Sequence, residues 1–210
     1  MASAFIREYP EVRIRLINGD TEMIIDDVLE GRVEFGLVGA KTRQRSIFQE
    51  PLFEDELAMI VASGHPWAGR TSVTLDELSR EPYITRKSGS GTLLTIRDLL
   101  ARQAYHLHDF NIISEMGSTA AVVNAVLAGG AVSIVSRVAV SENVKTGSLK
   151  ALSIAGLSLS RTFYRTRHMN RSLSPLGKRF ISFLKNARPP APAQVDDKPH
   201  RGWGKYLCGN

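Results

Sequence analysis

The residues best suited to chemistry form a short polar turn, Arg-Lys-Ser-Gly-Ser-Gly-Thr at 86–92, which leads into a segment with helical spacing of apolar residues. At a helix start the first backbone N–H groups have no partner within the helix, and the helix dipole favours negative charge. Glycines allow the backbone to approach a ligand, while hydroxyl groups and a guanidinium add donors. The turn therefore indicates a site for a small anion, formed by Arg86, Ser88, Gly89, Ser90, Gly91 and Thr92.

A simpler interpretation of the same turn stays open. Ser90 or Thr92 would cap the following helix, and the glycines would only turn the chain. A nucleotide-binding P-loop is excluded, because no Gly-Lys-Ser/Thr sequence follows the glycines.

Two other predicted helix starts carry hydroxyl groups directly after a predicted strand. Thr21 follows the alternating residues of 12–16, and Ser118 and Thr119 follow the apolar residues of 110–113. In open α/β sheets, ligands bind at the carboxyl ends of strands, where the next helices begin. The three starts either converge on one cleft lined with donors or are independent helix caps.

Composition limits the class of protein. The chain has 210 residues, a formal net charge of +6 and one cysteine, Cys208. No disulfide can form within the chain, which favours a reducing cytoplasm. No apolar run reaches the roughly 20 residues that span a membrane, and the first residues do not form a secretory signal. Lysine and arginine are scattered along the sequence, so we expect an attraction for small anions rather than a nucleic-acid surface.

Strand and helix patterns alternate, which predicts an α/β fold with largely parallel strands. The end of a first helix is expected at 5–9 and a final helix from Ser174. From residue 188 the chain is rich in proline and polar residues and is predicted to be a disordered tail. The strands expected between these ends are 12–16, 35–38, 57–62, 82–85, 110–113, 131–135, 149–154 and 159–166, with an extended segment at 47–53.

Several other polar residues are predicted to have no chemical role. The acidic run Glu54-Asp55-Glu56 is expected to be surface charge in a solvated turn at the start of a strand. No serine lies in a Gly-x-Ser-x-Gly sequence. The five histidines have no acidic or cysteine ligands at metal spacing; they are His65, His106, His108, His168 and His200. We therefore expect no enzyme, no metal and no cofactor.

The order of segments resembles the effector-binding domain of LysR-type transcriptional regulators. The resemblance covers residues 4 to about 187 and rests on six segments in the family's order. These are Phe5-Ile6-Arg7-Glu8-Tyr9-Pro10-Glu11-Val12-Arg13-Ile14-Arg15-Leu16, Leu29-Glu30-Gly31-Arg32-Val33-Glu34-Phe35-Gly36-Leu37-Val38, Val61-Ala62-Ser63-Gly64-His65-Pro66-Trp67-Ala68, Leu75-Asp76-Glu77-Leu78, Val126-Leu127-Ala128-Gly129-Gly130-Ala131-Val132-Ser133-Ile134-Val135 and the closing Ser174-Pro175-Leu176.

The resemblance implies a two-lobed α/β fold like that of type 2 periplasmic binding proteins, with parallel-rich sheets flanked by helices. One lobe would comprise residues 1–80 and 156–187, and the other 81–155. A small effector would bind between them, against Thr21, the turn at 88–92 and Ser118-Thr119. The turn also resembles a branch whose ligands are small sulfur oxyanions, but Lys87 and Leu93 depart from that branch's acidic and basic residues.

The family's winged helix-turn-helix domain is not in this sequence, nor is the first strand of the effector domain. The resemblance implies that the effector controls DNA binding through that helix-turn-helix domain, in a homodimer or tetramer of the full-length protein. No membrane partner is expected. The alternative is a free-standing small-solute-binding protein of the same fold.

Overall fold

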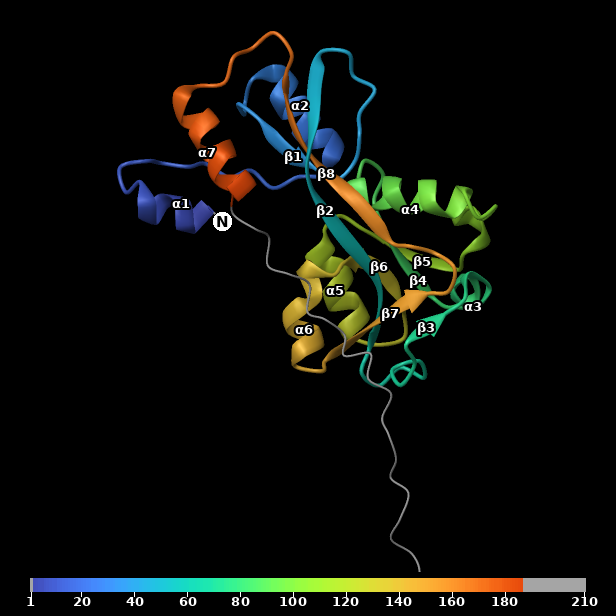
Figure 1. Ribbon diagram of the computed structural model, residues 1–210. Coiled ribbons are helices and arrows are strands. Elements are labelled where there is room, and N and C mark those ends of the chain that lie inside the picture. The colour runs from blue at the N-terminus through green and yellow to red at the C-terminus, as the bar shows by residue number, and fades with distance from the viewer. Residues whose placement is uncertain (1, 187–210) are drawn as a thin grey trace, which may run out of the picture.

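Two long antiparallel strands, β2 (Ile47–Ala62) and β8 (Ser160–His168), run through the molecule and join its two lobes (Figure 1). The computed structural model describes residues 2–186. The predicted disordered tail at 188–210, with Cys208, lies outside the described residues. No helix of residues 2–186 combines the length and the apolar character that crossing a bilayer requires.

The lobe at the top of Figure 1 is formed by the two ends of the described chain. Its elements are α1 (Ala2–Glu8), α2 (Thr21–Glu30), β1 (Gly36–Val38) and α7 (Pro175–Asn186). Phe5 is fully buried and packs edge-on against Phe180 and Phe183 of α7, which fixes the first helix to the last.

The lower lobe contains the middle of the chain. Its elements are β3 (Ser72–Val73), α3 (Leu75–Arg80), β4 (Tyr83–Arg86), α4 (Gly91–Ala101), a 3-10 turn (Leu107–Asp109), β5 (Ile112–Met116), α5 (Thr119–Leu127), β6 (Ser133–Ser136), a 3-10 turn (Val138–Val140), α6 (Ser141–Lys145) and β7 (Leu149–Ile154). The two apolar cores of this lobe lie on either side of β2, β6 and β7.

The pairing of strands is mixed. β3–β7 and β4–β5 are parallel, whereas β1–β8, β2–β8, β2–β6 and β2–β7 are antiparallel. The two-lobed α/β class expected from the sequence is confirmed. Parallel pairing is limited to these two short ladders and one bridge between Tyr83 and Val132, because β2 and β8 cross between the lobes in opposite directions.

The apolar cores bear on where one lobe ends. Leu57, Trp67, Val73 and Leu78 share a buried core with Tyr83 and with residues up to Leu159. The lobe boundary expected at residue 80 therefore falls inside one core. A boundary near Asp55, where β2 passes from one lobe to the other, agrees better with the packing. The division into lobes remains a proposal.

The strand predicted at 12–16 was wrong. Residues 12–16 form no strand, and residues 13–19 make no backbone–backbone hydrogen bond within the described part of the chain. Leu16 is 71% exposed. An alternating sequence becomes a strand only when a neighbouring strand supplies partners for its N–H and C=O groups, and none is present here.

The predicted turn at 54–56 was also wrong. β2 continues without interruption through these residues, and Asp55 faces the interior with 6% of its surface exposed. Glu54 and Glu56 on either side are exposed, as strand alternation requires. Only two of the three acidic residues therefore match the expected surface role.

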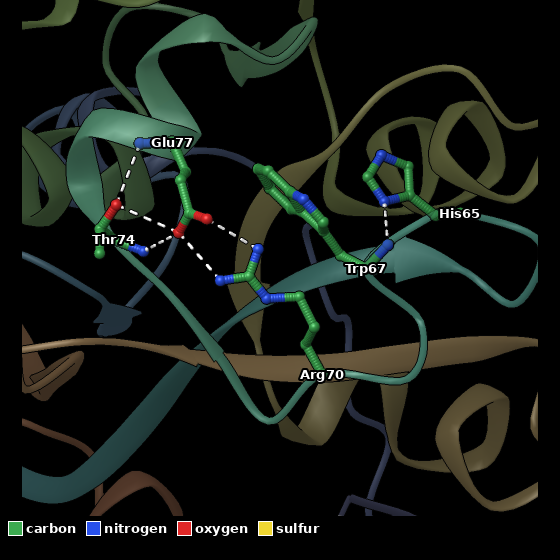
Figure 2. Close-up of polar contacts among 5 residues, drawn as sticks. All are labelled: His65, Trp67, Arg70, Thr74 and Glu77. Carbon is green, nitrogen blue, oxygen red and sulfur yellow. Dashed lines mark hydrogen bonds and ion pairs between the residues drawn. The ribbon is translucent and has the colours of Figure 1, made fainter.

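The start of helix α3 is stabilised by side chains close to it in the sequence (Figure 2). Thr74 Oγ1 accepts from the N–H of Glu77 at 3.1 Å, and a carboxylate oxygen of Glu77 accepts from the N–H of Thr74 at 2.8 Å. Arg70 donates to both carboxylate oxygens of Glu77. Nearby, Nδ1 of His65 accepts from the N–H of Trp67 at 3.1 Å, a contact that holds the turn after β2.

Candidate functional site

The starts of α2 and α4 lie against each other. The glycines of the polar turn allow this approach. The N–H of Glu22 donates to the carbonyl of Gly89 at 3.4 Å. A Cβ placed on Gly91 would lie 2.6 Å from Thr21 Oγ1 and 2.9 Å from the carbonyl carbon of Gly39. Only glycine fits at 91, and the hydroxyl of Thr21 therefore lies at the start of α4.

Arg86 ties the start of α5 to the end of β4. Its Nη1 donates to Thr119 Oγ1 at 2.8 Å, its Nη2 to the carbonyl of Gly117 at 3.1 Å and its Nε to the carbonyl of Met116 at 3.3 Å. These three hydrogen bonds hold the guanidinium in one orientation. A ligand that binds to it would therefore cost little side-chain conformational entropy.

Two of the predicted hydroxyl groups behave differently as caps. Ser118 accepts from the N–H of Ala121 at 3.1 Å and caps α5 as expected. The sequence predicted that Ser90 or Thr92 caps α4, and this was wrong. Ser90 precedes α4 but its side chain makes no capping hydrogen bond, and Thr92 lies inside the helix and accepts from Arg161. Ser90 is nevertheless 1% exposed, which leaves a buried hydroxyl at a helix start without that partner.

An ion pair closes the other side of the polar turn. Lys87 Nζ lies 2.7 Å from Oδ2 of Asp20, whose other oxygen accepts from the N–H of Met23 and caps α2. Burial by itself would raise the pKa of Asp20, but the hydrogen bonds from Lys87 and Met23 and the charges of Lys87 and Arg86 together lower this pKa below its ordinary value. Asp20 is therefore held ionised beside the turn.

A buried pair that the sequence did not reveal lies next to Thr92. Nε and Nη2 of Arg161 both contact Oδ2 of Asp55 at 2.8 Å, and Nη1 of Arg161 donates to Thr92 Oγ1 at 2.8 Å. The side chains of Arg161 and Asp55 are 8% and 4% exposed. Ser136 donates to the second carboxylate oxygen of Asp55. The alternation of β8 and β2 was the available signal, because it places both residues on inward positions.

The charge of Arg161 acts on the guanidinium of Arg86. Burial lowers the pKa of Arg86, and the positive charge of Arg161 lowers it further, while Asp20 opposes the shift. Burial also lowers the pKa of Arg161, against the effect of Asp55. Arg161 contacts the start of α4 and Arg86 the start of α5, and an anion bound near both starts would reduce the repulsion between the two positive charges.

The predicted residues therefore divide into three groups. Thr21, Gly89, Ser90, Gly91 and Thr92 lie together at the junction of α2, α4 and β8. Thr119 joins them through Arg86, and Ser118 lies beside Thr119 with an exposed side chain. Ser88 is exposed and has no side-chain hydrogen bond within residues 2–186.

Neither of two surface cavities includes these residues. An apolar cavity of about 470 Å³ lies between residues 12–19, β1 and α7, and a basic cavity of about 490 Å³ lies beside the loop that joins β8 to α7. Within residues 2–186, no group of three or more His, Cys, Asp or Glu side chains could hold a metal ion. The candidate site is thus a set of polar groups at three helix starts, several of which are hydrogen-bonded to Arg86 or Arg161.

Comparisons with known proteins agree on one family. The family model described as the LysR substrate binding domain matches residues 1–189. The HTH-type transcriptional regulator YeiE of Escherichia coli K12 is 32% identical over 183 residues, which cover 87% of this chain and 61% of YeiE. The chain thus spans about three-fifths of that relative's length.

Solved structures show the same fold. The regulatory domain of Synechocystis PCC6803 CcmR in complex with 2-PG superposes with a TM-score of 0.80 at 23% identity, covering 91% of both chains. The effector-binding domain of QuiR in complex with shikimate superposes with a TM-score of 0.76 at 23% identity, covering 88% of this chain and 87% of that one. On the match of the family model and the likeness to YeiE, this chain belongs to the LysR substrate-binding domain family.

Proposed function

We propose that this chain senses a small anionic effector, bound where α2, α4 and α5 begin, and thereby controls DNA binding by a helix-turn-helix domain. The family is one of effector-binding regulatory domains and not a class of enzymes.

One observation carries the proposal. Arg86 and Arg161 bring two guanidinium groups to the N-terminal ends of α5 and α4, where unpaired backbone N–H groups also favour negative charge. The buried hydroxyl of Ser90 and that of Thr21 lie at the same ends. The donors come from β4, β8 and the starts of α2, α4 and α5, and an oxyanion is the ligand that such donors suit.

Arg161 suggests how occupancy would change the lobes. It connects Thr92 at the start of α4 to Asp55 on β2, one of the two strands that cross between the lobes. An anion that accepts from Arg161 and from the start of α4 would compete with Thr92 for the same N–H. The effector would then favour a different angle between the lobes, and this shift would be transmitted to a DNA-binding domain.

The ligands of the structural neighbours support a small-molecule effector. CcmR binds 2-PG and QuiR binds shikimate in the named complexes. The free-standing solute-binding alternative is less well supported, because YeiE is a helix-turn-helix regulator. We also propose that the whole protein acts in the cytoplasm as a homodimer or tetramer, as is expected for the family.

Thermal unfolding in the presence of single anions tests the effector proposal. Sulfite, sulfate, thiosulfate, phosphate, acetate and aromatic carboxylates would be compared at equal ionic strength. An effector at about 100 times its dissociation constant adds about 2.7 kcal/mol to the free energy of unfolding, a rise of about 5–10 °C in Tm. A selective rise for one anion supports the proposal, whereas equal Tm values with all of them, in a chain that unfolds cooperatively, would oppose an anionic effector.

A further inference from the structure

The basic cavity beside the loop from β8 to α7 lies apart from the candidate effector site. Its wall contains Arg165 and Arg167 of β8, Arg171 of the loop and Lys178 of α7. Figure 1 shows this loop in orange at the top of the molecule. In the sequence these four cations are spread over fourteen positions among other residues, and only the fold brings them to one cavity.

The carboxylates of β2 balance some of the arginines of β8 but not all of them. Across the ladder, Arg161 faces Asp55 and Arg165 faces Glu50, and each pair forms a salt bridge. Arg167 faces Phe48 instead, with its guanidinium 4.6 Å from the ring centroid. No aspartate or glutamate is among the residues that line the cavity.

Three of the positive charges have no carboxylate partner within residues 2–186. These are the charges of Arg167, Arg171 and Lys178. Uncompensated like charges around one cavity repel each other, and the repulsion is weakened when an anion binds between them.

Hydrogen bonds to backbone carbonyls hold Arg167 and Arg171 in place and leave some of their N–H groups free to bind a ligand. Nη1 of Arg167 donates to the carbonyls of His168 and Met169 at 3.0 Å, and Nη1 of Arg171 donates to the carbonyl of Val28 at 3.1 Å. A guanidinium has five N–H groups, so each of these two arginines keeps further donors. The buried Nε of Arg165 has no hydrogen-bond partner, although the residue is only 9% exposed. Such an unpaired buried donor is costly unless a ligand or water accepts from it.

We propose that this cavity is a second anion site, which binds the phosphate group of a small molecule through Arg165, Arg167, Arg171 and Lys178. Fixed guanidinium groups match the oxygens of phosphate in pairs, and lysine adds a point charge. A volume of about 490 Å³ is that of a small-molecule site. The site lies on β8 and α7 and uses none of the residues proposed for the effector.

Inorganic phosphate and pyrophosphate are the probes, added at constant ionic strength to the ¹⁵N-labelled chain. The backbone amides of residues 169–173 and 178 should shift in a saturable manner. Lys178→Gln removes a charge that makes no ion pair within residues 2–186, and it should weaken this binding about tenfold. Lys150→Gln, on the exposed face of β7, removes one positive charge from another lobe and should leave the affinity unchanged.

The outcomes separate this inference from the proposed function. If phosphate shifts only the amides near the starts of α2, α4 and α5, the second site is refuted and the effector proposal stands. If Lys178→Gln and Lys150→Gln bind equally, the cavity is not the site. If duplex DNA shifts residues 169–178 while neither free anion does, the surface contacts nucleic acid and the proposed small-molecule ligand is wrong. Loss of the shifts in Thr92→Val would also contradict a separate site.

Discussion

Nη1 of Arg161 donates to Oγ1 of Thr92 over 2.8 Å, although the two residues are 69 positions apart. Through this bond the start of α4 is connected to the buried Arg161–Asp55 pair at the crossing of β2 and β8. The polar turn at 86–92 can be recognised in the sequence. This contact connects it to the strands that run between the lobes.

Thr92→Val should lower the free energy of unfolding by about 1–3 kcal/mol, because it leaves a buried guanidinium N–H without an acceptor. Thr92→Ser keeps the hydroxyl and should lose little of this stability. Urea unfolding of the two variants beside the wild type measures the difference. Equal losses for valine and serine would show that methyl packing, rather than the hydrogen bond, determines the effect.

Asp55→Asn should destabilise the chain by about 3–5 kcal/mol, since it removes one charge of a buried pair and leaves Arg161 uncompensated. Glu54→Gln is the matched control, because Glu54 is the exposed neighbour on the same strand. Chemical unfolding of both variants should show a large loss for the first and a small one for the second. Similar stabilities would mean that Asp55 is solvated, as the acidic run alone suggests.

Local chemistry is the part of the fold that a sequence can predict. Gly31 at the end of α2 adopts a positive φ of 76°, and Thr74 caps α3, and both are signals that act within a few residues. Residues 12–16 alternate like a strand but find no partner, which a pattern within one segment cannot reveal. Asp55 and Arg161 look like surface charges until the register of β2 against β8 places them opposite each other. The turn at 86–92 could therefore be predicted, but its connection to the crossing strands could not.

Gly91→Ala should disturb the junction of α2 and α4. The added methyl group would lie 2.6 Å from Thr21 Oγ1 and 2.9 Å from the backbone of Gly39, so one of the helices must move. A loss of about 1–3 kcal/mol in the free energy of unfolding is expected from such overpacking. Gly64→Ala, where no atom lies within 4 Å of the new methyl, is the control. If both variants unfold at the same Tm, α2 and α4 are not packed as described.

Glu77 gives a prediction about pH. Hydrogen bonds from Arg70, assisted by the backbone of Thr74, lower its pKa from 4.5 to about 2 (Figure 2). A carboxyl with a depressed pKa in the folded state stabilises the fold fully above its unfolded value, and this contribution is lost as the pH falls towards the folded value. The stability difference between the wild type and Glu77→Gln should therefore shrink between about pH 4.5 and pH 2.

Urea titrations across that pH range provide the measurement. Glu11→Gln is the control, because Glu11 is exposed and has no ion pair among the described residues. The stability difference between this variant and the wild type should not shrink over the same pH range. A constant difference for Glu77→Gln between pH 5 and pH 2 would be incompatible with the pairing of Glu77 and Arg70.

The most direct test of the account is calorimetric titration of the anion selected by thermal unfolding into three proteins: the wild type, Arg86→Gln and Lys150→Gln. Arg86 is anchored by three hydrogen bonds at the start of α5, and Lys150 is an exposed cation on β7. If an anionic effector binds at the starts of α2, α4 and α5, Arg86→Gln should weaken binding at least about tenfold, which corresponds to a lost charged hydrogen bond, while Lys150→Gln binds like the wild type. Equal dissociation constants for all three proteins would place the effector elsewhere and contradict the account.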